Sequence, residues 1–274
     1  MRKAREQRLD LHMHSTRSDG KLSPSEVLRQ CALGGLDIIA LTDHDMPPAL
    51  PWGVQSVAGR DIRVIHGVEL STIHEDTEQH LLVYFPGEMP AAFAERCRQL
   101  VIARADRYDE AVRRINLPGL VLADDAARRG ERSLTRTHLS QALVDTGHAR
   151  NLQDAFDRWT GERAALVPHV QLSFLDAIRA AVAAGGITSW AHPNLKQARL
   201  WVKDASAAGL HALEVYRPRI ARTRQDGLIR LAARNRLALT GGSDFHGWSP
   251  GQLGAFSVSG RRVRDWGRRL SLHV

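Results

Sequence analysis

The chain has 274 residues, of which 43% are hydrophobic and 25% are charged, which is enough apolar sequence for a large globular core. No apolar run approaches the roughly 18 residues of a membrane span, and two isolated cysteines, Cys31 and Cys97, exclude a disulfide framework and a thiolate zinc site. The formal net charge of +8 favours anionic partners, either phosphorylated metabolites or nucleic acid, and we expect a cytoplasmic protein with no membrane association and no obligate protein partner.

Seven apolar runs in chain order have the length of β-strands. They lie at 9–11, 36–41, 62–68, 80–85, 187–190, 212–216 and 237–239. Two helices between them carry cap signals: one begins at Ser23 and stops at Gly34, and another begins at Ser173 and stops at Gly185. Apolar strands that alternate with helices predict a parallel sheet or barrel covered by helices.

The stretch 87–170 has no strong strand signal and predicts four helices. It separates the fourth predicted strand from the fifth. We therefore expect a discontinuous barrel body, 1–86 and 171–274, that is interrupted by a helical insertion domain at 87–170.

Histidines and carboxylates recur at the ends of the predicted strands. His12 and His14, spaced i and i+2, project from the same face of an extended segment. Six further candidates also follow a predicted strand: Asp19, His44, Glu69, His192, Asp244 and His246. The exception is His80, which stands at the beginning of its apolar run. Each residue taken singly could be a capping aspartate or a hydrogen-bonded histidine, but loops at the carboxyl ends of parallel strands converge. The set as a whole predicts a multinuclear metal site, and its imidazole and carboxylate donors suit manganese, zinc or iron.

A site with several divalent ions and few carboxylates keeps excess positive charge, which attracts phosphate. The ions also lower the pKa of bound water towards about 7, so phosphoester hydrolysis follows more naturally than deamination or peptide cleavage. Arg136, at the start of a predicted helix in the insertion, could clamp a phosphate with two parallel hydrogen bonds.

Five segments together resemble the PHP (polymerase and histidinol phosphatase) family of metal-dependent phosphoesterases. They are 10–20, 39–45, 67–71, 191–193 and 240–247. The resemblance implies an α/β fold, a distorted (β/α)7 barrel with a helical insertion between strands four and five. It also implies two to three divalent ions, of which manganese is the first expectation, at the mouth formed by the carboxyl ends of the strands.

The resemblance further assigns nine metal ligands. His12, His14, Glu69 and Asp244 would hold one ion; Asp19, His44 and His246 would hold a second; His80, His192 and a bridging Glu69 would hold a third.

The resemblance is greatest to a subgroup of 3′,5′-nucleoside bisphosphate phosphatases and 5′ to 3′ exoribonucleases. It implies that Arg136 and His138 contact phosphate. We expect these two residues and Arg217 to hold the non-reacting phosphate while a metal-bridging hydroxide attacks phosphorus. The expected substrate is a 3′,5′-bisphosphonucleotide or a short 5′-phosphorylated RNA. Two alternatives are a histidinol-phosphatase-like monoesterase and a non-catalytic PHP module that binds nucleic acid.

Overall fold

The computed structural model describes residues 6–248 and 251–272. Nine strands in this part of the chain form one mixed sheet in the order β8-β7-β6-β5-β4-β2-β1-β9, with β3 attached to β4. They are β1 (Arg8–Asp10), β2 (Ile38–Leu41), β3 (Gly53–Val57), β4 (Arg60–His74), β5 (Thr77–Tyr84), β6 (Ile187–Trp190), β7 (Ala212–Tyr216), β8 (Ala238–Gly241) and β9 (Val258–Ser259). The seven predicted strands form the continuous path from β1 to β8, so the predicted α/β barrel class is confirmed.

The prediction of a parallel sheet is wrong at one strand. β5 pairs antiparallel with both β4 and β6, whereas the other neighbours between β1 and β8 are parallel. β4 is also longer than predicted, because it continues past Glu69 to His74 and turns directly into β5. Two short strands were not predicted: β3 alternates buried and exposed residues beside β4, and β9 has only two residues.

Backbone hydrogen bonds nearly close the sheet into a barrel at one end. The segment after β1 meets the segment after β8, where Asp244 N–H donates to the His12 carbonyl at 2.8 Å and His14 N–H donates to the Phe245 carbonyl at 2.9 Å. The chain therefore brings its first and last predicted ligand segments together at the mouth.

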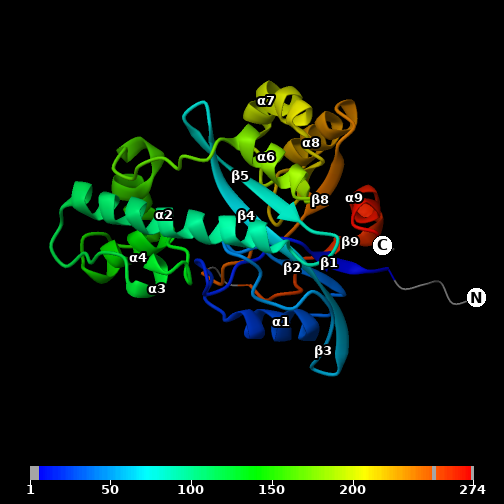
Figure 1. Cartoon of the computed structure of the whole chain (residues 1–274), viewed down its shortest axis with the longest axis horizontal. Helices are drawn as coiled ribbons and strands as arrows, with labels where there is room; N and C mark the ends of the chain where they lie inside the picture. The colour runs from blue at the N-terminus through cyan, green and yellow to red at the C-terminus, as the bar shows by residue number, and fades with distance from the viewer. Residues whose placement is uncertain (1–5, 249–250, 273–274) are drawn as a thin grey trace, which may run out of the picture.

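Helices cover the sheet on two sides (Figure 1). One side carries α6 (Phe174–Ala183), α7 (Leu195–Ala208) and α8 (Arg222–Arg234), and the other carries α1 (Pro24–Leu33). The caps of α1 and α6 follow the sequence signals, since Ser23 and Ser173 accept hydrogen bonds from the third residue of each helix. After β9, a 3-10 turn (Gly260–Val263) leads into α9 (Arg264–Arg269), whose buried Trp266 packs edge-on against Tyr84. No described helix is both long enough and apolar enough to cross a membrane.

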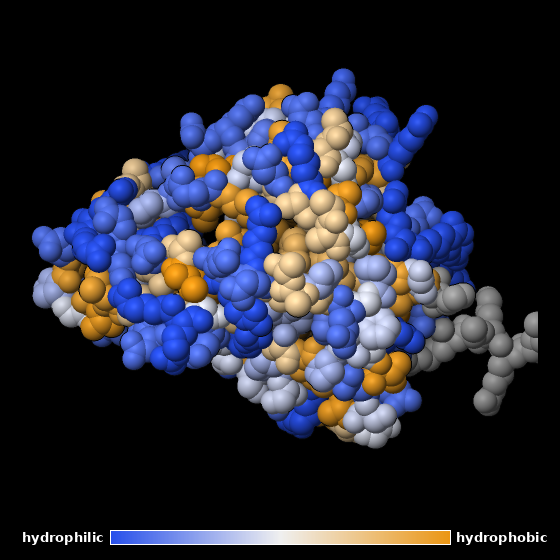
Figure 2. Space-filling model, in the orientation of Figure 1, coloured by the Kyte–Doolittle hydropathy of each residue, from blue (hydrophilic) through white to orange (hydrophobic). Residues whose placement is uncertain are grey.

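The segment between β5 and α6 projects from one end of the barrel (Figure 1). It contains α2 (Ala91–Ile115), α3 (Asp125–Arg128), α4 (Arg136–Asp145) and α5 (Leu152–Ala155), followed by a π-helical turn (Phe156–Thr160) and a 3-10 turn (Glu162–Ala164). The long helix α2 joins two cores, because Phe93 and Cys97 pack on the barrel while Ala111 and Ile115 pack on α4. Hydrophilic side chains cover most of the visible face of this segment (Figure 2).

Candidate metal centre

The two histidines that follow β1 face a pair of carboxylates. The Nε2 atoms of His12 and His14 each lie 3.2 Å from Glu69 Oε2 and 3.4 Å from Asp244 Oδ1. Ligand atoms at about 2.1 Å from a tetrahedral ion lie about 3.4 Å from each other. The four histidine–carboxylate distances match this spacing, and His12, His14 and Asp244 each offer a ligand atom that lies within 4.8 Å of the other two.

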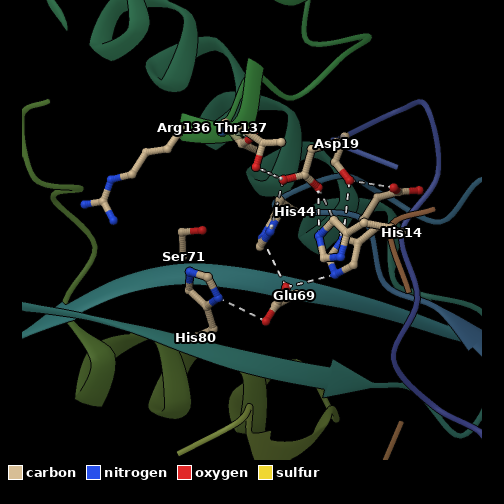
Figure 3. Close-up of polar contacts among 12 residues, drawn as sticks. His14, Asp19, His44, Glu69, Ser71, His80, Arg136 and Thr137 are labelled. Atoms are coloured by element: carbon tan, nitrogen blue, oxygen red, sulfur yellow. Dashed lines mark hydrogen bonds and ion pairs between the residues drawn. The ribbon is translucent and has the colours of Figure 1, made fainter. Parts of the chain in front are cut away.

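A second group of donors gathers around Asp19 beside the first (Figure 3). His246 Nε2 lies 3.2 Å from Asp19 Oδ1, and His44 Nε2 lies 3.9 Å from Asp19 Oδ2. One ligand atom from each of these three residues and from His14 fits within 4.8 Å of the others. This group is wider than the first, and its residues could share a second ion.

A third group uses the other oxygen of Glu69. Glu69 Oε1 lies 3.1 Å from His80 Nδ1 and 3.0 Å from His192 Nε2, and the two ring nitrogens are 3.1 Å apart. His80 reaches this mouth because β5 runs antiparallel to its neighbours, so that its beginning lies beside the ends of the parallel strands. His80 begins its apolar run instead of following it, and the reversed direction of β5 explains why it still lies with the other candidates.

Buried polar atoms without hydrogen-bond partners mark the space between these side chains. They are His12 Nε2, His14 Nε2, Asp19 Oδ1, His44 Nδ1 and Glu69 Oε2. An orphaned buried donor or acceptor costs about 1–3 kcal/mol, and five of them converge on one place. Imidazole nitrogens and carboxylate oxygens suit a first-row divalent ion, so the residues present fit such an ion.

The carboxylates also control protonation of the imidazoles. Although burial lowers it, the pKa of His14 is raised to about 10 by the neighbouring carboxylates of Asp244 and Glu69. Against the effect of burial, the facing histidines hold the pKa of both carboxyls well below the usual range: His12, His44 and His80 act on Glu69, and His12 and His14 act on Asp244. Without metal the cluster therefore retains protons, which a bound ion must displace.

Two of the donor residues have unusual backbone conformations. His192, after β6, has φ of 32°, and Asp244, after β8, has φ of 53°, and such left-handed conformations are costly outside glycine. The segment that carries Asp244 lies against the barrel because Gly242 has no side chain: a Cβ there would lie 2.3 Å from the Cβ of His12. The strained backbone at His192 and Asp244 and the close contact between Gly242 and His12 thus both lie at the candidate centre.

Residues 10–158 match the family model of the PHP domain. The chain belongs to the PHP domain family.

Similar proteins extend this relationship over most of the chain. A 3′,5′-nucleoside bisphosphate phosphatase of Chromobacterium violaceum is 29% identical over 255 residues, which cover 90% of this chain and 89% of that protein. A 5′-3′ exoribonuclease of Haemophilus influenzae is 32% identical over 251 residues, 87% of this chain and 91% of that protein. A crystal structure from Bifidobacterium adolescentis, assigned as a metal-dependent phosphoesterase, superposes with a TM-score of 0.77 at 26% identity and covers 95% of this chain and 96% of that one.

A carboxylate that sequence reasoning missed supports two donors of this PHP domain. Glu214 is fully buried in β7; its Oε1 lies 2.9 Å from His12 Nδ1, and its Oε2 accepts a hydrogen bond from the His192 N–H at 2.7 Å. A carboxylate in this position fixes the tautomer and orientation of a metal-binding imidazole. The available signal was a lone glutamate inside an otherwise apolar strand.

The aspartates beside His44 have other partners than the imidazoles. Asp43 and Asp45 flank His44 in the sequence, so either could be expected to orient an imidazole ring or to stabilise a turn. Asp43 accepts hydrogen bonds from Ser15 and Ser18 in the loop after β1, so its contacts are those of a turn. Asp45 pairs with the buried Arg104 of α2 and thereby joins the insertion to the barrel.

The predicted phosphate-binding residues lie outside the donor groups. Arg136 pairs with Glu78 at 2.9 Å, and its side chain extends away from Asp19 and His14 (Figure 3). His138 accepts a hydrogen bond from the N–H of Thr135 as part of the cap of α4, and burial lowers its pKa. Arg217 follows β7.

Thr137, between the two predicted phosphate contacts, is the α4 residue that touches the cluster. Its hydroxyl donates to Asp19 Oδ2 at 3.2 Å, and Figure 3 shows it pointing towards that carboxylate, opposite to Arg136. The first turn of α4 therefore reaches the donor groups through Thr137, which sequence reasoning did not single out.

Proposed function

We propose that this protein is a metal-dependent phosphoester hydrolase that acts on nucleotides. The substrate would be a 3′,5′-bisphosphonucleotide that loses its 3′ phosphate, a short 5′-phosphorylated RNA that is shortened from its 5′ end, or both. One observation carries the proposal: five imidazole nitrogens lie 3.0–3.2 Å from the carboxylate oxygens of one buried residue, Glu69. Such a carboxylate has the surroundings of a ligand that bridges metal ions.

In this proposal the centre holds two to three divalent ions, with manganese as the first expectation and zinc or iron as alternatives. The ligands would be His12, His14, Glu69 and Asp244 for one ion, Asp19, His44 and His246 for another, and His80 and His192 with Glu69 for a third. The segment 87–170 would act as an insertion domain that covers this mouth.

When bound, the ions would supply a nucleophilic water of lowered pKa and positive charge for the phosphoryl oxygens. The protein's own residues would position these groups. Glu214 holds the His12 ring and the His192 backbone at once, and Thr137 holds Asp19. Displacement at phosphorus depends mainly on position and charge, so this fixed arrangement suits the reaction.

Arg136 would bind the phosphate that does not react, with help from His138 and Arg217. The Nη1 atom of Arg136 pairs with Glu78 at 2.9 Å, so the binding of a phosphate would require this pair to open. A guanidinium with free donors can bind phosphate oxygens in parallel. The nucleotide class itself is supported by the named activities of the two relatives and by the net charge of +8.

A substrate panel tests the proposal. Manganese-loaded protein is incubated with adenosine 3′,5′-bisphosphate, with a 5′-phosphorylated tetraribonucleotide and with histidinol phosphate, and released phosphate and mononucleotide are measured. We expect turnover of one or both nucleotides and its loss in Asp244→Ala. Turnover of histidinol phosphate alone would overturn the nucleotide assignment, and no turnover of any compound would favour a binding module.

A further inference from the structure

An open cavity of about 720 Å³ adjoins the metal centre. Asp244 and His246 belong both to the donor groups and to the cavity wall. One wall comes from the insertion, through Thr137, Leu152 and Phe156, and the other comes from the loops that follow β7 and β8. The cavity is within the range of about 300–1,000 Å³ that is typical of small-molecule sites, and a molecule in it would touch the centre.

The cavity wall contains four aromatic side chains. They are Phe156, Phe245, Trp248 and Phe256. Trp248 also supports the centre, because its indole N–H donates to the Asp19 carbonyl at 2.6 Å, and Phe245 packs partly on the core around Met13. Phe156 is half-buried and is the aromatic residue that the insertion contributes.

An uncommon backbone conformation sets the position of Phe156. It begins the π-helical turn, and its carbonyl accepts the Gly161 N–H at 2.8 Å. Gly161 is needed because a Cβ there would lie 2.5 Å from that carbonyl oxygen. The turn is anchored on α4 by a buried contact of 2.7 Å between the hydroxyls of Thr160 and Ser140. Single π-helical turns are rare and occur frequently at functional sites.

We propose that this cavity binds the nucleobase of the substrate and that Phe156 is the residue on which the base stacks. The proposal deepens the proposed function and rests on it. A base is flat and apolar on its faces and polar at its edges, which matches aromatic walls interrupted by a few polar groups such as Ser243 and Gln252. A nucleotide whose phosphate lies at the ions that Asp244 and His246 would help to hold could extend its base into the cavity without leaving the mouth.

Kinetics with and without the base test this assignment. We compare kcat/KM of the manganese-loaded protein for adenosine 3′,5′-bisphosphate and for the same bisphosphate without its base. Stacking on one aromatic side chain predicts a loss of about tenfold in Phe156→Ala for the adenosine compound, mainly through KM, and no loss for the abasic one. Phe156→Tyr keeps a ring and should retain activity, and Leu200→Ala, which removes an exposed apolar side chain from α7, is the matched control.

Equal losses for both compounds, or none for either, would overturn the base subsite while the proposed function stands. A binding measurement separates the two claims further. Trp248 lines the cavity, so its fluorescence should respond to adenosine 5′-monophosphate, with about tenfold weaker binding in Phe156→Ala. If the protein hydrolyses neither bisphosphate but shows this difference in binding, the proposed function fails and the subsite remains. If the wild-type protein binds no adenosine 5′-monophosphate, the subsite is wrong.

Discussion

Replacement of Glu214 by glutamine tests how the buried carboxylate supports the metal centre. Glu214 is fully buried, and its two oxygens face two hydrogen-bonding groups: the Nδ1 of His12 at 2.9 Å and the backbone N–H of His192 at 2.7 Å. A glutamine has one oxygen, so its NH2 group must face one of these donors. An unsatisfied buried donor costs about 1–3 kcal/mol, and loss of a partner that orients a ligand typically costs 10–100-fold in metal affinity, which is about 1.4–2.8 kcal/mol.

We therefore expect Glu214→Gln to bind manganese 10–100-fold more weakly than the wild type. The measurement is a titration of metal-free protein with manganese against a chromogenic chelator, together with thermal unfolding in the absence of metal. Asp109→Asn is the matched control: Asp109 is a buried carboxylate of α2 that accepts hydrogen bonds from the Ala123 N–H and from Arg128, neither of which is a candidate ligand. The control should lose stability but keep its metal affinity. Unchanged affinity in Glu214→Gln, or an equal loss in both variants, would refute the reasoning.

Three further predictions concern the fold around the centre and its protons. Gly242→Ala places a Cβ 2.3 Å from the Cβ of His12, so metal content after purification should fall sharply, and a normal content by elemental analysis would contradict the close approach. The carboxylate partners of His14 raise its pKa to about 10 against the effect of burial, so a metal ion must displace a proton from this ring. Manganese affinity should therefore rise between pH 6 and pH 9, and an affinity that does not change with pH would count against this coupling. Burial raises the pKa of the Cys31 and Cys97 thiols, so both should react with a disulfide reagent only after unfolding in urea, and rapid reaction of the folded protein would argue against their burial.

The strand path was predictable because its signals are local. Each of the seven apolar runs forms a strand, and the cap residues Ser23 and Ser173 begin helices where expected. The direction of β5 was not predictable, since an apolar run looks the same in a parallel or an antiparallel pair. The reversal depends on the two-residue turn at Glu75 and Asp76, which both have positive φ, and sequence reasoning overlooked it because glycine and asparagine are the usual residues there.

The candidate donors could be named in advance because histidine and carboxylate recur after one predicted strand after another. The residues that support these donors could not be named from the sequence. Arg104 and Glu78 look like ordinary charged residues of an amphipathic helix and of a strand end. Yet the buried Arg104 pairs with Asp45, and the half-buried Glu78 pairs with Arg107 and Arg136, so that both link the insertion to the barrel. Such pairs link positions that are far apart in sequence, and a single sequence contains no signal for the partner. The π-helical turn at Phe156 likewise involves a partner outside the turn, since the Thr160 hydroxyl contacts Ser140 of α4.

Metal loading followed by phosphate release tests the central claim most directly. Protein stripped of metal is titrated with manganese, and bound metal and phosphate released from adenosine 3′,5′-bisphosphate are measured on the same samples. The account predicts no turnover without metal, activity that rises in proportion to bound ion up to two to three per chain, and neither tight binding nor turnover in Asp244→Ala. Full turnover by the metal-free protein, or saturated metal sites without any hydrolysis of a nucleotide, would contradict it.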